Sequence, residues 1–539
     1  MRINPERLAR ASAGRPWLTL GSWVVLLVAA GFVSSQLLGD ALTNDFDFTN
    51  RPESVRARDL ISERLRGPET LSETFIVRSE QLTVDEPAFE EKVRTVQSDL
   101  ASLGTGLVQA SFSFYETEDP SMVSDDQHAT LVTAVLPDDI DRLTDHVEEI
   151  RAVAEDHTGS GFETLVIGDV TISDDFNTVA EEDLAKGESF GIGAALIVLI
   201  VVFGAIVAAL LPIFLAIGAI VLAVGAVALI GQWMDFSFFV TNMITMMGLA
   251  VGIDYSLFIV SRYREERAHG LDKLAAISAA GATANRAVFF SGMTVVLALI
   301  GLLLVPTTIF MSLGLGAILV VLAAVLASMT LLPAILSLLG DRINSLRILG
   351  RRKVPGAPPK DGGFWDRITH GVMARPVIAL VLAAGLLVAA GWSYFDMNIG
   401  FAGVSTAPDD MPTKRAYAVL ASEFSGGFTS PVEIVIDGDA HEVSGDIEIL
   451  QELLADSGSF GPSTVETNEA GDLTVISAPV AGDPSGEAAT GAVEKLREAS
   501  IPFVFGDNDV EVLVGGATAF NKDFFDLTDT YTPIVFAFV

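Results

Sequence analysis

The chain has 539 residues, of which 50% are hydrophobic, and its mean hydropathy of +0.48 is too high for an ordinary soluble protein. Its formal net charge of -36 and its lack of an extended basic patch argue against nucleic-acid binding. The absence of cysteine excludes disulfides and thiolate metal sites, and we predict no cofactor and no metal. The apolar residues gather in long runs, which predicts a multi-span α-helical membrane protein.

The apolar runs predict seven full membrane spans and the beginning of an eighth. The N-terminal segment, residues 1–16, carries four arginines, and the run after it is too long for the core of a signal peptide. The expected spans are residues 17–38, 189–211, 213–231, 236–261, 287–305, 310–339 and 377–395, of which the second to sixth form a bundle over 189–339. We expect the turn between the second and third spans at Leu211-Pro212. The last run, 532–539, covers only ~12 Å of helix, so we expect a C-terminally truncated chain.

Arginine and lysine residues mark the cytoplasmic side of a membrane protein. Here they gather before the first span, between the fourth and fifth spans, and in a basic loop over residues 340–376. The long segments 39–188 and 396–531 therefore fall on the extracytoplasmic side. This alternation is consistent across all seven spans.

Each long outer segment predicts a small α+β domain. Strands and helices follow one another in the order β-α-β-β-α-β, which is typical of ferredoxin-like, or split βαβ, folds. The expected strands are residues 74–79, 107–115, 130–136 and 162–167 in the first domain and 432–436, 464–467, 473–478 and 510–514 in the second. The amphipathic stretch Ser54–Leu65 is expected to pack beneath the first domain, with lipid contact as the alternative.

The second half of the chain repeats the first. The run Leu26–Gly31 recurs as Leu386–Gly391, and Asp175-Phe176 matches Asp523-Phe524. Both halves start inside and place their domain outside, so they are parallel repeats, an organisation found in transporters. Chance similarity is an alternative for the apolar run alone, but much less so for the matching order of elements.

An acidic residue and a tyrosine, Asp254 and Tyr255, interrupt the apolar run of the fourth span. Along a helix, Asp254 lies ~12 Å from Arg262 and ~28 Å from Asp235, so we expect a carboxyl buried in the middle or inner half of the membrane. Such a group usually faces a bundle interior or a water path. Two interpretations remain open from the residues alone. One is a proton relay with Tyr255 as the neighbouring hydroxyl, and the other is a structural carboxyl that stays protonated.

Further polar side chains on the fourth and fifth spans could extend a proton path from Asp254. The alternative for each is a local hydrogen bond within its own helix. The candidates are Ser291, Thr294, Asn242 and Thr245.

Two glycines four residues apart, Gly248 and Gly252, precede Asp254 on the fourth span. This spacing allows two helices to approach closely, and we assign both residues to helix packing. Close approach would let another helix reach the Asp254 carboxyl, with generic small-residue packing as the alternative.

The stretch Gly252-Ile-Asp-Tyr-Ser-Leu-Phe-Ile-Val-Ser-Arg-Tyr-Arg-Glu-Glu266 closely resembles the MmpL family of the resistance-nodulation-division (RND) superfamily, and so does Ala279–Ser291. The order of spans and outer domains resembles that family over essentially the whole chain. The resemblance implies an exporter of lipids or other hydrophobic molecules, driven by the proton motive force, in a prokaryotic cytoplasmic membrane. It also implies ferredoxin-like porter domains and an Asp-Tyr pair in each half. Asp254 and Tyr255 match the first pair, and the second would lie beyond residue 539.

The expected partners are protons and a membrane lipid or hydrophobic small molecule, with self-association left open. Two other functions compete with export. A protein-translocation accessory of the SecD/SecF type shares the architecture, but its motifs differ from Gly-Ile-Asp-Tyr. In a non-transporting lipid or sterol sensor, Asp254 would be dispensable. An enzyme is the least expected class because neither outer segment shows a catalytic constellation.

Overall fold

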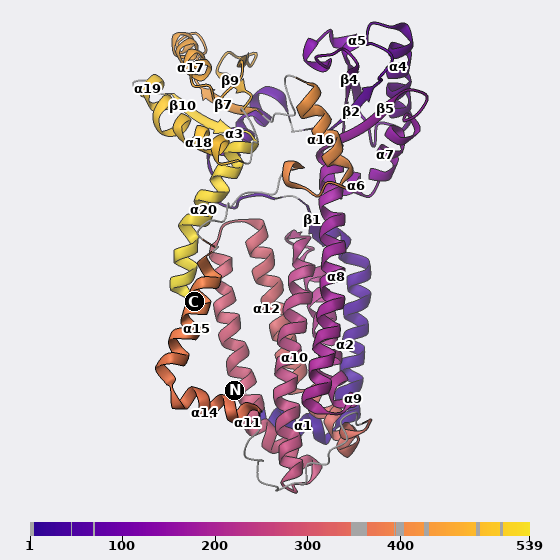
Figure 1. Ribbon diagram of the computed structural model, residues 1–539, viewed down its shortest axis with the longest axis vertical. Helices are drawn as coiled ribbons and strands as arrows, with labels where there is room; N and C mark the ends of the chain where they lie inside the picture. Colours follow the sequence, from indigo (N-terminus) through magenta and orange to yellow (C-terminus); the bar gives the residue numbers. More distant parts are fainter. Residues whose placement is uncertain are drawn as a thin grey trace.

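The computed structural model shows a bundle of long helices with two α+β domains side by side at one end (Figure 1). Most of the predicted basic loop, residues 347–363, and the end of the predicted seventh span, residues 393 and 395, lie outside the described residues. The structure describes residues 5–44, 46–67, 70–346, 364–392, 394, 404–424, 431–480, 486–506 and 510–539.

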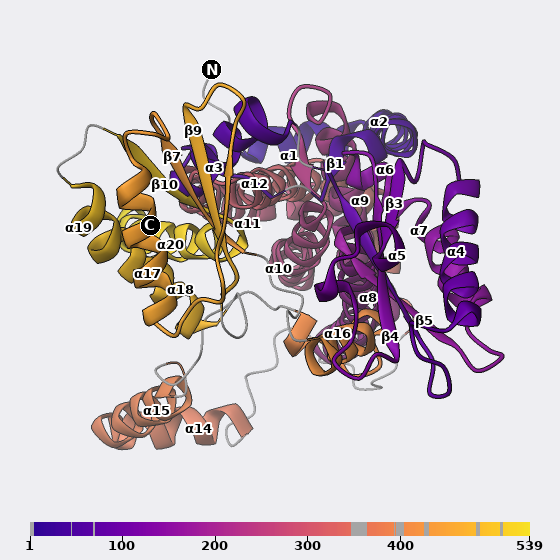
Figure 2. The ribbon, with the colours of Figure 1, turned by 90° about the horizontal axis from the view of Figure 1, so that it is seen from above.

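The bundle is built mainly from apolar helices. They are α1 (Pro5–Gly14), α2 (Pro16–Leu37), α8 (Asp169–Phe203), α9 (Ile206–Ile230), α10 (Phe239–Ala268), α11 (Lys273–Leu299), α12 (Thr308–Met329) and α13 (Leu331–Leu339), with the 3₁₀ turns η4 (Ile300–Leu304) and η5 (Gly340–Asn344). Helices α14 (Phe364–Ala374) and α15 (Pro376–Gly391) stand apart from this bundle (Figure 2). Six helices in the described part of the chain are long and apolar enough to cross a membrane, and the pair α14–α15, bent by 102°, would make a seventh. Interhelical hydrogen bonds are few in such a core, and one joins Trp23 Nε1 to Thr330 Oγ1 at 3.0 Å.

The turn between the second and third spans lies at Gly204 and not at Pro212, so the predicted position was wrong. Gly204 has a φ of +64°, a left-handed conformation that glycine adopts without steric cost, and it ends α8. Pro212 instead lies inside α9, as prolines do in membrane helices whose neighbours compensate the missing hydrogen bond. The helix before the turn is also longer than expected: α8 begins at Asp169, within the predicted first domain, and continues unbroken through the second span.

The first domain is a four-stranded antiparallel sheet with the strand order β3-β4-β2-β5. Its elements are β2 (Ser72–Arg78), α4 (Pro87–Ser102), β3 (Ala110–Ser113), α5 (Phe114–Thr117), η3 (Pro120–Met122), β4 (Ala129–Val135), α6 (Ile140–Thr144), α7 (Val147–Asp156) and β5 (Glu163–Gly168). Side chains of α4 and α7 pack on one face of the sheet around Phe75 and Val77. Strand β3 is shorter than expected because Ser113 and Glu116 form a capping box that starts α5.

The second domain has the equivalent strand order, β10-β7-β9-β8, also antiparallel. Its elements are β7 (Val432–Asp437), α17 (Ser444–Asp456), β8 (Thr464–Thr467), β9 (Leu473–Ala478), α18 (Glu487–Lys495), the π-turn η8 (Leu496–Ser500), α19 (Ile501–Phe505) and β10 (Glu511–Gly515). One face of the sheet packs on α17, α18 and α19. The chain then enters α20 (Ala517–Phe538), which descends towards the bundle as α8 does from the first domain (Figure 1).

The second face of each sheet is covered by a short helix from the other half of the chain. Helix α16 (Pro412–Glu423) packs with Val419 and Leu420 on the first sheet, and α3 (Glu53–Ile61) packs with Ala57 and Ile61 on the second. Figure 2 shows α16 beside β4 and α8, and α3 beside β7 and β10. The prediction that residues 54–65 lie beneath the first domain was therefore wrong.

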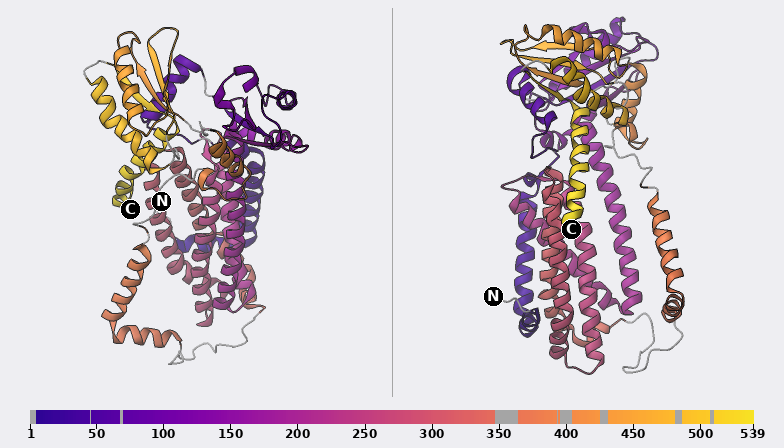
Figure 3. Two further views of the ribbon diagram at one scale, coloured as in Figure 1. Left: turned by 45° about the horizontal axis from the view of Figure 1, so that its top comes forward. Right: turned by 90° about the vertical axis from the view of Figure 1, so that its left-hand side faces the viewer.

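The segment between α2 and α3 also ties the domains to the bundle. After η1 (Gly39–Ala41), β1 (Leu42–Thr43) pairs in parallel with β6 (Phe236–Ser237), directly before α10. The chain then passes to α3 and its π-turn η2 (Ser62–Arg66) on the far side of the molecule, as the two views of Figure 3 show. In the second half, η7 (Val404–Thr406) precedes α16.

Candidate proton-relay site

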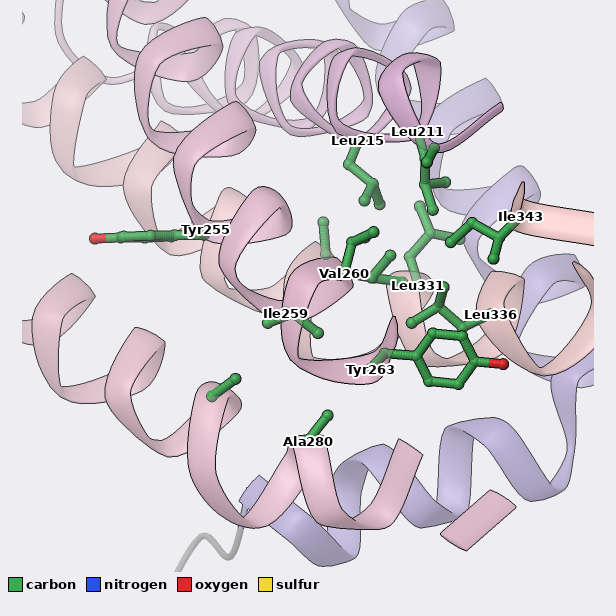
Figure 4. Packing of buried hydrophobic residues seen from close by; sticks show 14 of the residues in the cluster. Leu211, Leu215, Tyr255, Ile259, Val260, Tyr263, Ala280, Leu331, Leu336 and Ile343 are labelled. Carbon is green, nitrogen blue, oxygen red and sulfur yellow. The ribbon is translucent and has the colours of Figure 1, made fainter. Parts of the chain in front are cut away.

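Helix α10 carries the predicted site and is held by neighbours on several sides. It packs against α9, α11 and α12. Towards the end that is far from the domains, Ile259, Val260 and Tyr263 are buried among leucines of α9 and α13 (Figure 4). The apolar stripe of α10 thereby fixes the rotation of the helix and the directions in which its polar side chains point.

Asp254 is exposed among the described residues, so no described helix covers it, and its expected depth in the membrane stays a prediction. The reason lies in the helical repeat. Successive residues are ~100° apart around a helix, which puts Asp254 on the opposite side of α10 from Gly252. In the described part of the chain, the face that carries Asp254 remains accessible.

Gly248 and Gly252 face α9 and do not bring a helix to Asp254. A Cβ atom added to Gly252 would lie 2.7 Å from the Cα of Ala216, and one added to Gly248 would lie 2.4 Å from Ile220. Any side chain at these two positions would therefore push α10 away from α9.

Tyr255 is buried, with 6% of its surface exposed, and its ring points away from Leu211 and Leu215 in Figure 4. Its hydroxyl is close enough to the Ser291 side chain of α11 to interact with it. The structure thus brings together two of the predicted site residues from different helices, and one of them, Tyr255, directly follows Asp254 in the sequence.

The other predicted polar residues are engaged within their own helices. Thr294 Oγ1 donates to the carbonyl of Phe290 at 2.9 Å, and Thr245 Oγ1 donates to the carbonyl of Thr241 at 3.0 Å. Asn242 accepts a long bond of 3.4 Å from Thr241 Oγ1. This is the local bonding that stood as the alternative, and it joins none of the three to Asp254.

Asn285 is a polar residue that the sequence analysis missed. It lies on α11 with 1% of its surface exposed, and neither amide atom has a hydrogen-bond partner among the described residues. Along α11 it is ~9 Å from Ser291. The predicted fifth span began at residue 287, whereas α11 begins at Lys273, so Asn285 was assigned to a loop. A buried amide within a membrane helix is a signal that a longer predicted span would have included.

The arrangement offers an accessible carboxyl group followed by a buried phenol and a hydroxyl on the next helix. A carboxyl can take up and release a proton, and hydrogen-bonded hydroxyls can pass one on. No cluster of three His, Asp or Glu side chains suited to a metal ion occurs in the described part of the chain.

The apolar helices define the chain as a multi-span membrane protein. The sequence model of the MMPL family matches residues 48–379, which is more than half of the chain, and the chain belongs to this family.

Relatives with assigned names support the same family. The chain is 34% identical over 385 residues to the mycolic acid-containing lipids exporter MmpL11 of Mycolicibacterium smegmatis, covering 69% of this chain and 40% of the relative. It is 28% identical over 547 residues to the heme uptake protein MmpL11 of Mycobacterium tuberculosis, covering 99% and 55%. It is 25% identical over 560 residues to the trehalose monomycolate exporter MmpL3 of Mycolicibacterium smegmatis, covering 94% and 54%. The chain thus spans 40% to 55% of the length of these relatives.

Proposed function

We propose that this chain takes part in the export of lipids or other hydrophobic molecules across the cytoplasmic membrane, driven by the proton motive force. Asp254 takes up and releases the proton, and Tyr255 and Ser291 tune or relay it. The proposal rests on the accessible Asp254 carboxyl beside the buried Tyr255, whose hydroxyl interacts with Ser291 of the next helix, in an MMPL-family bundle.

The cost of a carboxylate in the membrane supports a functional role for Asp254. Placing a charged side chain at the centre of a membrane helix costs at least ~2.5 kcal/mol on the most lenient scale. A residue needed only for packing would not require a titratable group there. In addition, no described helix covers Asp254, so α10 need not move away from α9 to free its carboxyl.

The names of the relatives support a lipid substrate. Two of the three are named as exporters of mycolic acid-containing lipids and of trehalose monomycolate, whereas the third is named for heme uptake. Lipid export is the proposal here, and movement of haem is an outcome that the transport experiment must distinguish.

The two α+β domains are, in this proposal, ferredoxin-like porter domains on the extracytoplasmic side. Their strand orders and the basic residues at the opposite end of the bundle support this orientation. Ser98 on α4 and Ser457 after α17 are exposed, and single cysteines can be introduced there because the chain has none of its own. Both should react with a membrane-impermeant maleimide in whole cells, while Ser345→Cys should react only after lysis. The reverse pattern would overturn the orientation.

The transport test uses proteoliposomes that contain a fluorescent NBD-phospholipid, whose movement between leaflets is followed by dithionite quenching. An imposed pH gradient should accelerate this movement in the wild type. Asp254→Asn keeps the shape of the side chain but removes the proton, and it should abolish the gradient-dependent rate. Tyr255→Phe should reduce the rate less.

Asp235→Asn is the matched control, because Asp235 is an exposed acid at the outer end of the same span. It should leave the rate unchanged. If well-folded Asp254→Asn protein moves the probe at the wild-type rate, the relay assignment is wrong and the sensor interpretation gains support. Gradient-driven movement of haemin without movement of the phospholipid would instead overturn the lipid substrate.

A further inference from the structure

The matching Asp-Phe pairs of the two halves, Asp175-Phe176 and Asp523-Phe524, have no part in the proposed relay. Both aspartates nevertheless occupy equivalent places. Each lies near the start of the long helix that leaves its domain, α8 or α20, and each is buried, with 7% and 8% of its surface exposed. A buried carboxylate requires compensation, so its partners indicate why it is there.

Asp175 attaches a helix of the second half to a helix of the first. One carboxylate oxygen accepts a bond from Arg151 of α7 at 2.7 Å. The other accepts bonds from the backbone N–H and the hydroxyl of Thr413, at 3.0 and 2.6 Å, in the first turn of α16. We call Arg151, Asp175 and Thr413 the Asp175 clamp.

Asp523 makes the same arrangement with the halves exchanged. Arg497 of η8 donates to both of its oxygens, at 2.5 and 3.3 Å. The backbone N–H of Ser54, in the first turn of α3, donates to one of these oxygens at 2.9 Å. Arg497 also contacts Glu53 at 3.2 Å. Arg497, Asp523 and Ser54 form the Asp523 clamp.

Both clamps therefore combine one guanidinium with the positive N-terminal end of a helix that is more than 230 residues away in the sequence. The arginine side chains are themselves mostly buried, at 12% and 14% exposure. A helix end can be capped by residues of its own half, so the need for a cap does not explain why the partner comes from the other half. The same construction on both sides argues against a chance contact.

We infer that Asp175 and Asp523 are positioning residues of the transport cycle. Each couples the long helix that joins the membrane to its domain, α8 or α20, to the short helix of the opposite half, α16 or α3, and to the linkers of that helix. The inference rests on the proposed function. Because α8 is unbroken from Asp169 to Phe203, a displacement of the second span is transmitted along the helix to Asp175. The Asp175 clamp transmits this displacement to α16, which belongs to the second half of the chain. The Asp523 clamp does the same from α20 to α3.

Two variants test the attachment itself by hydrogen exchange measured by mass spectrometry. Asp175→Asn should raise the exchange rate of the first turn of α16 about tenfold, as expected for a weakened helix cap, and leave α3 unchanged. Asp523→Asn should do the reverse. Asp174→Asn is the matched control, since Asp174 binds the same Arg151 at 3.0 Å but makes no hydrogen bond to α16 among the described residues. If neither helix exchanges faster, the carboxylates do not hold them and the inference fails.

The coupling is tested by distances between spin labels at Ser98→Cys and Ala455→Cys, on exposed positions of the two domains. In proteoliposomes, the pH on the side of the domains is held constant and only that of the opposite compartment is changed. The distance should shift in the wild type and in Asp174→Asn. In Asp175→Asn and in Asp523→Asn, at least three quarters of this change in distance should be lost.

The two proposals fail in different ways. Wild-type transport by Asp254→Asn refutes the relay, whatever the clamps do. Wild-type phospholipid movement, or an unchanged distance shift, in folded Asp175→Asn and Asp523→Asn protein refutes the coupling while leaving the relay intact. A wild-type protein whose domains do not move with the pH of the opposite compartment also refutes it.

Discussion

The two outer domains share their strand order and their clamps but differ at the point where each long helix begins. In the first domain, Glu73 of β2 is fully buried and accepts bonds from the N–H groups of Val170 and Thr171 at the start of α8. The equivalent position of β7 is Val432, since Gly516, the N-cap of α20, lies against Pro431 and Val432 as Gly168 lies against Ser72 and Glu73. The next residue of β7, Glu433, forms an ion pair with Arg66, which follows α3.

This difference shows that one scaffold can carry two kinds of charge compensation. The first domain holds a buried acid by helix-end hydrogen bonds, without a cation. The second has the apolar Val432 at that place, and it holds the neighbouring Glu433 by Arg66 from the other half of the chain. The start of α8 should therefore respond to pH, whereas the second domain should respond to the loss of its contacts with the α3 segment.

Removing the clamp arginines should have the largest effect on stability. Arg151→Ala and Arg497→Ala each leave a buried aspartate without its cation, which costs about 3–5 kcal/mol. The measurement is the denaturant dependence of hydrogen exchange in the sheet of each domain. Arg94→Ala, which breaks an exposed pair with Glu90 on α4, should cost less than about 0.5 kcal/mol. Equal costs for the control and the two clamp variants would show that the clamps are not held by charge.

The second largest effect should be a difference between the two domains in how their stability depends on pH. Burial raises the pKa of Glu73 from 4.5 to about 7, more than the hydrogen bonds from Thr171 and Val170 lower it, and the nearby Asp169 adds to the rise. An acid whose pKa is higher when folded contributes stability that is complete below pH 4.5 and lost as the pH rises to about 7. The first domain should lose up to about 3 kcal/mol across this window.

Glu73→Gln should flatten that dependence, because the amide keeps an acceptor for α8 but does not titrate. Protection of the amides of Val170 and Thr171, measured from pH 4.5 to 8 as a ratio to Glu73→Gln, provides the test. Glu433→Gln serves as the comparison in the second domain and should leave the pH profile of the first unchanged. Parallel profiles for wild type and Glu73→Gln would remove Glu73 as the pH-sensitive group.

The N-cap glycines of α8 and α20 should give intermediate effects. A Cβ on Gly168 would lie 2.1 Å from the carbonyl oxygen of Ser72, and one on Gly516 would lie 2.3 Å from that of Pro431. Overpacking of this kind costs about 1–3 kcal/mol. Gly516→Ala should cost ~1 kcal/mol more, since its φ of +89° is unfavourable for a side chain, whereas Gly168 is extended. Gly491→Ala in α18 meets no neighbouring atom and should be neutral or stabilising in the same unfolding measurement.

Sequence reasoning succeeded where local patterns determine structure. Apolar runs marked the bundle helices, and the Gly-Ile-Asp-Tyr stretch led to the family that the comparison established. It failed where contacts join residues far apart. The exchange of α3 and α16 depends on which of two similar sheets each amphipathic helix reaches, and hydrophobic periodicity does not encode the choice between sheets. The accessible face of Asp254 likewise depends on how α10 rotates against α9, to which Gly252 contributes from two residues away.

The smallest expected effect is the change in stability when a single hydroxyl group is removed from each clamp. Thr413 Oγ1 donates to Asp175 at 2.6 Å, whereas the buried Oγ of Ser54 has no hydrogen-bond partner among the described residues. Thr413→Ala should therefore cost about 1 kcal/mol from the lost hydrogen bond, in addition to the loss of its methyl group. Ser54→Ala removes only an unsatisfied polar atom and should be neutral or slightly stabilising. Thr413→Ser, which retains the hydroxyl but not the methyl, separates the two contributions in the same exchange experiment. If Ser54→Ala destabilised the Asp523 clamp as much as Thr413→Ala destabilises the Asp175 clamp, the two clamps would be chemically equivalent after all, and the contrast between a side-chain bond and a backbone bond would be wrong.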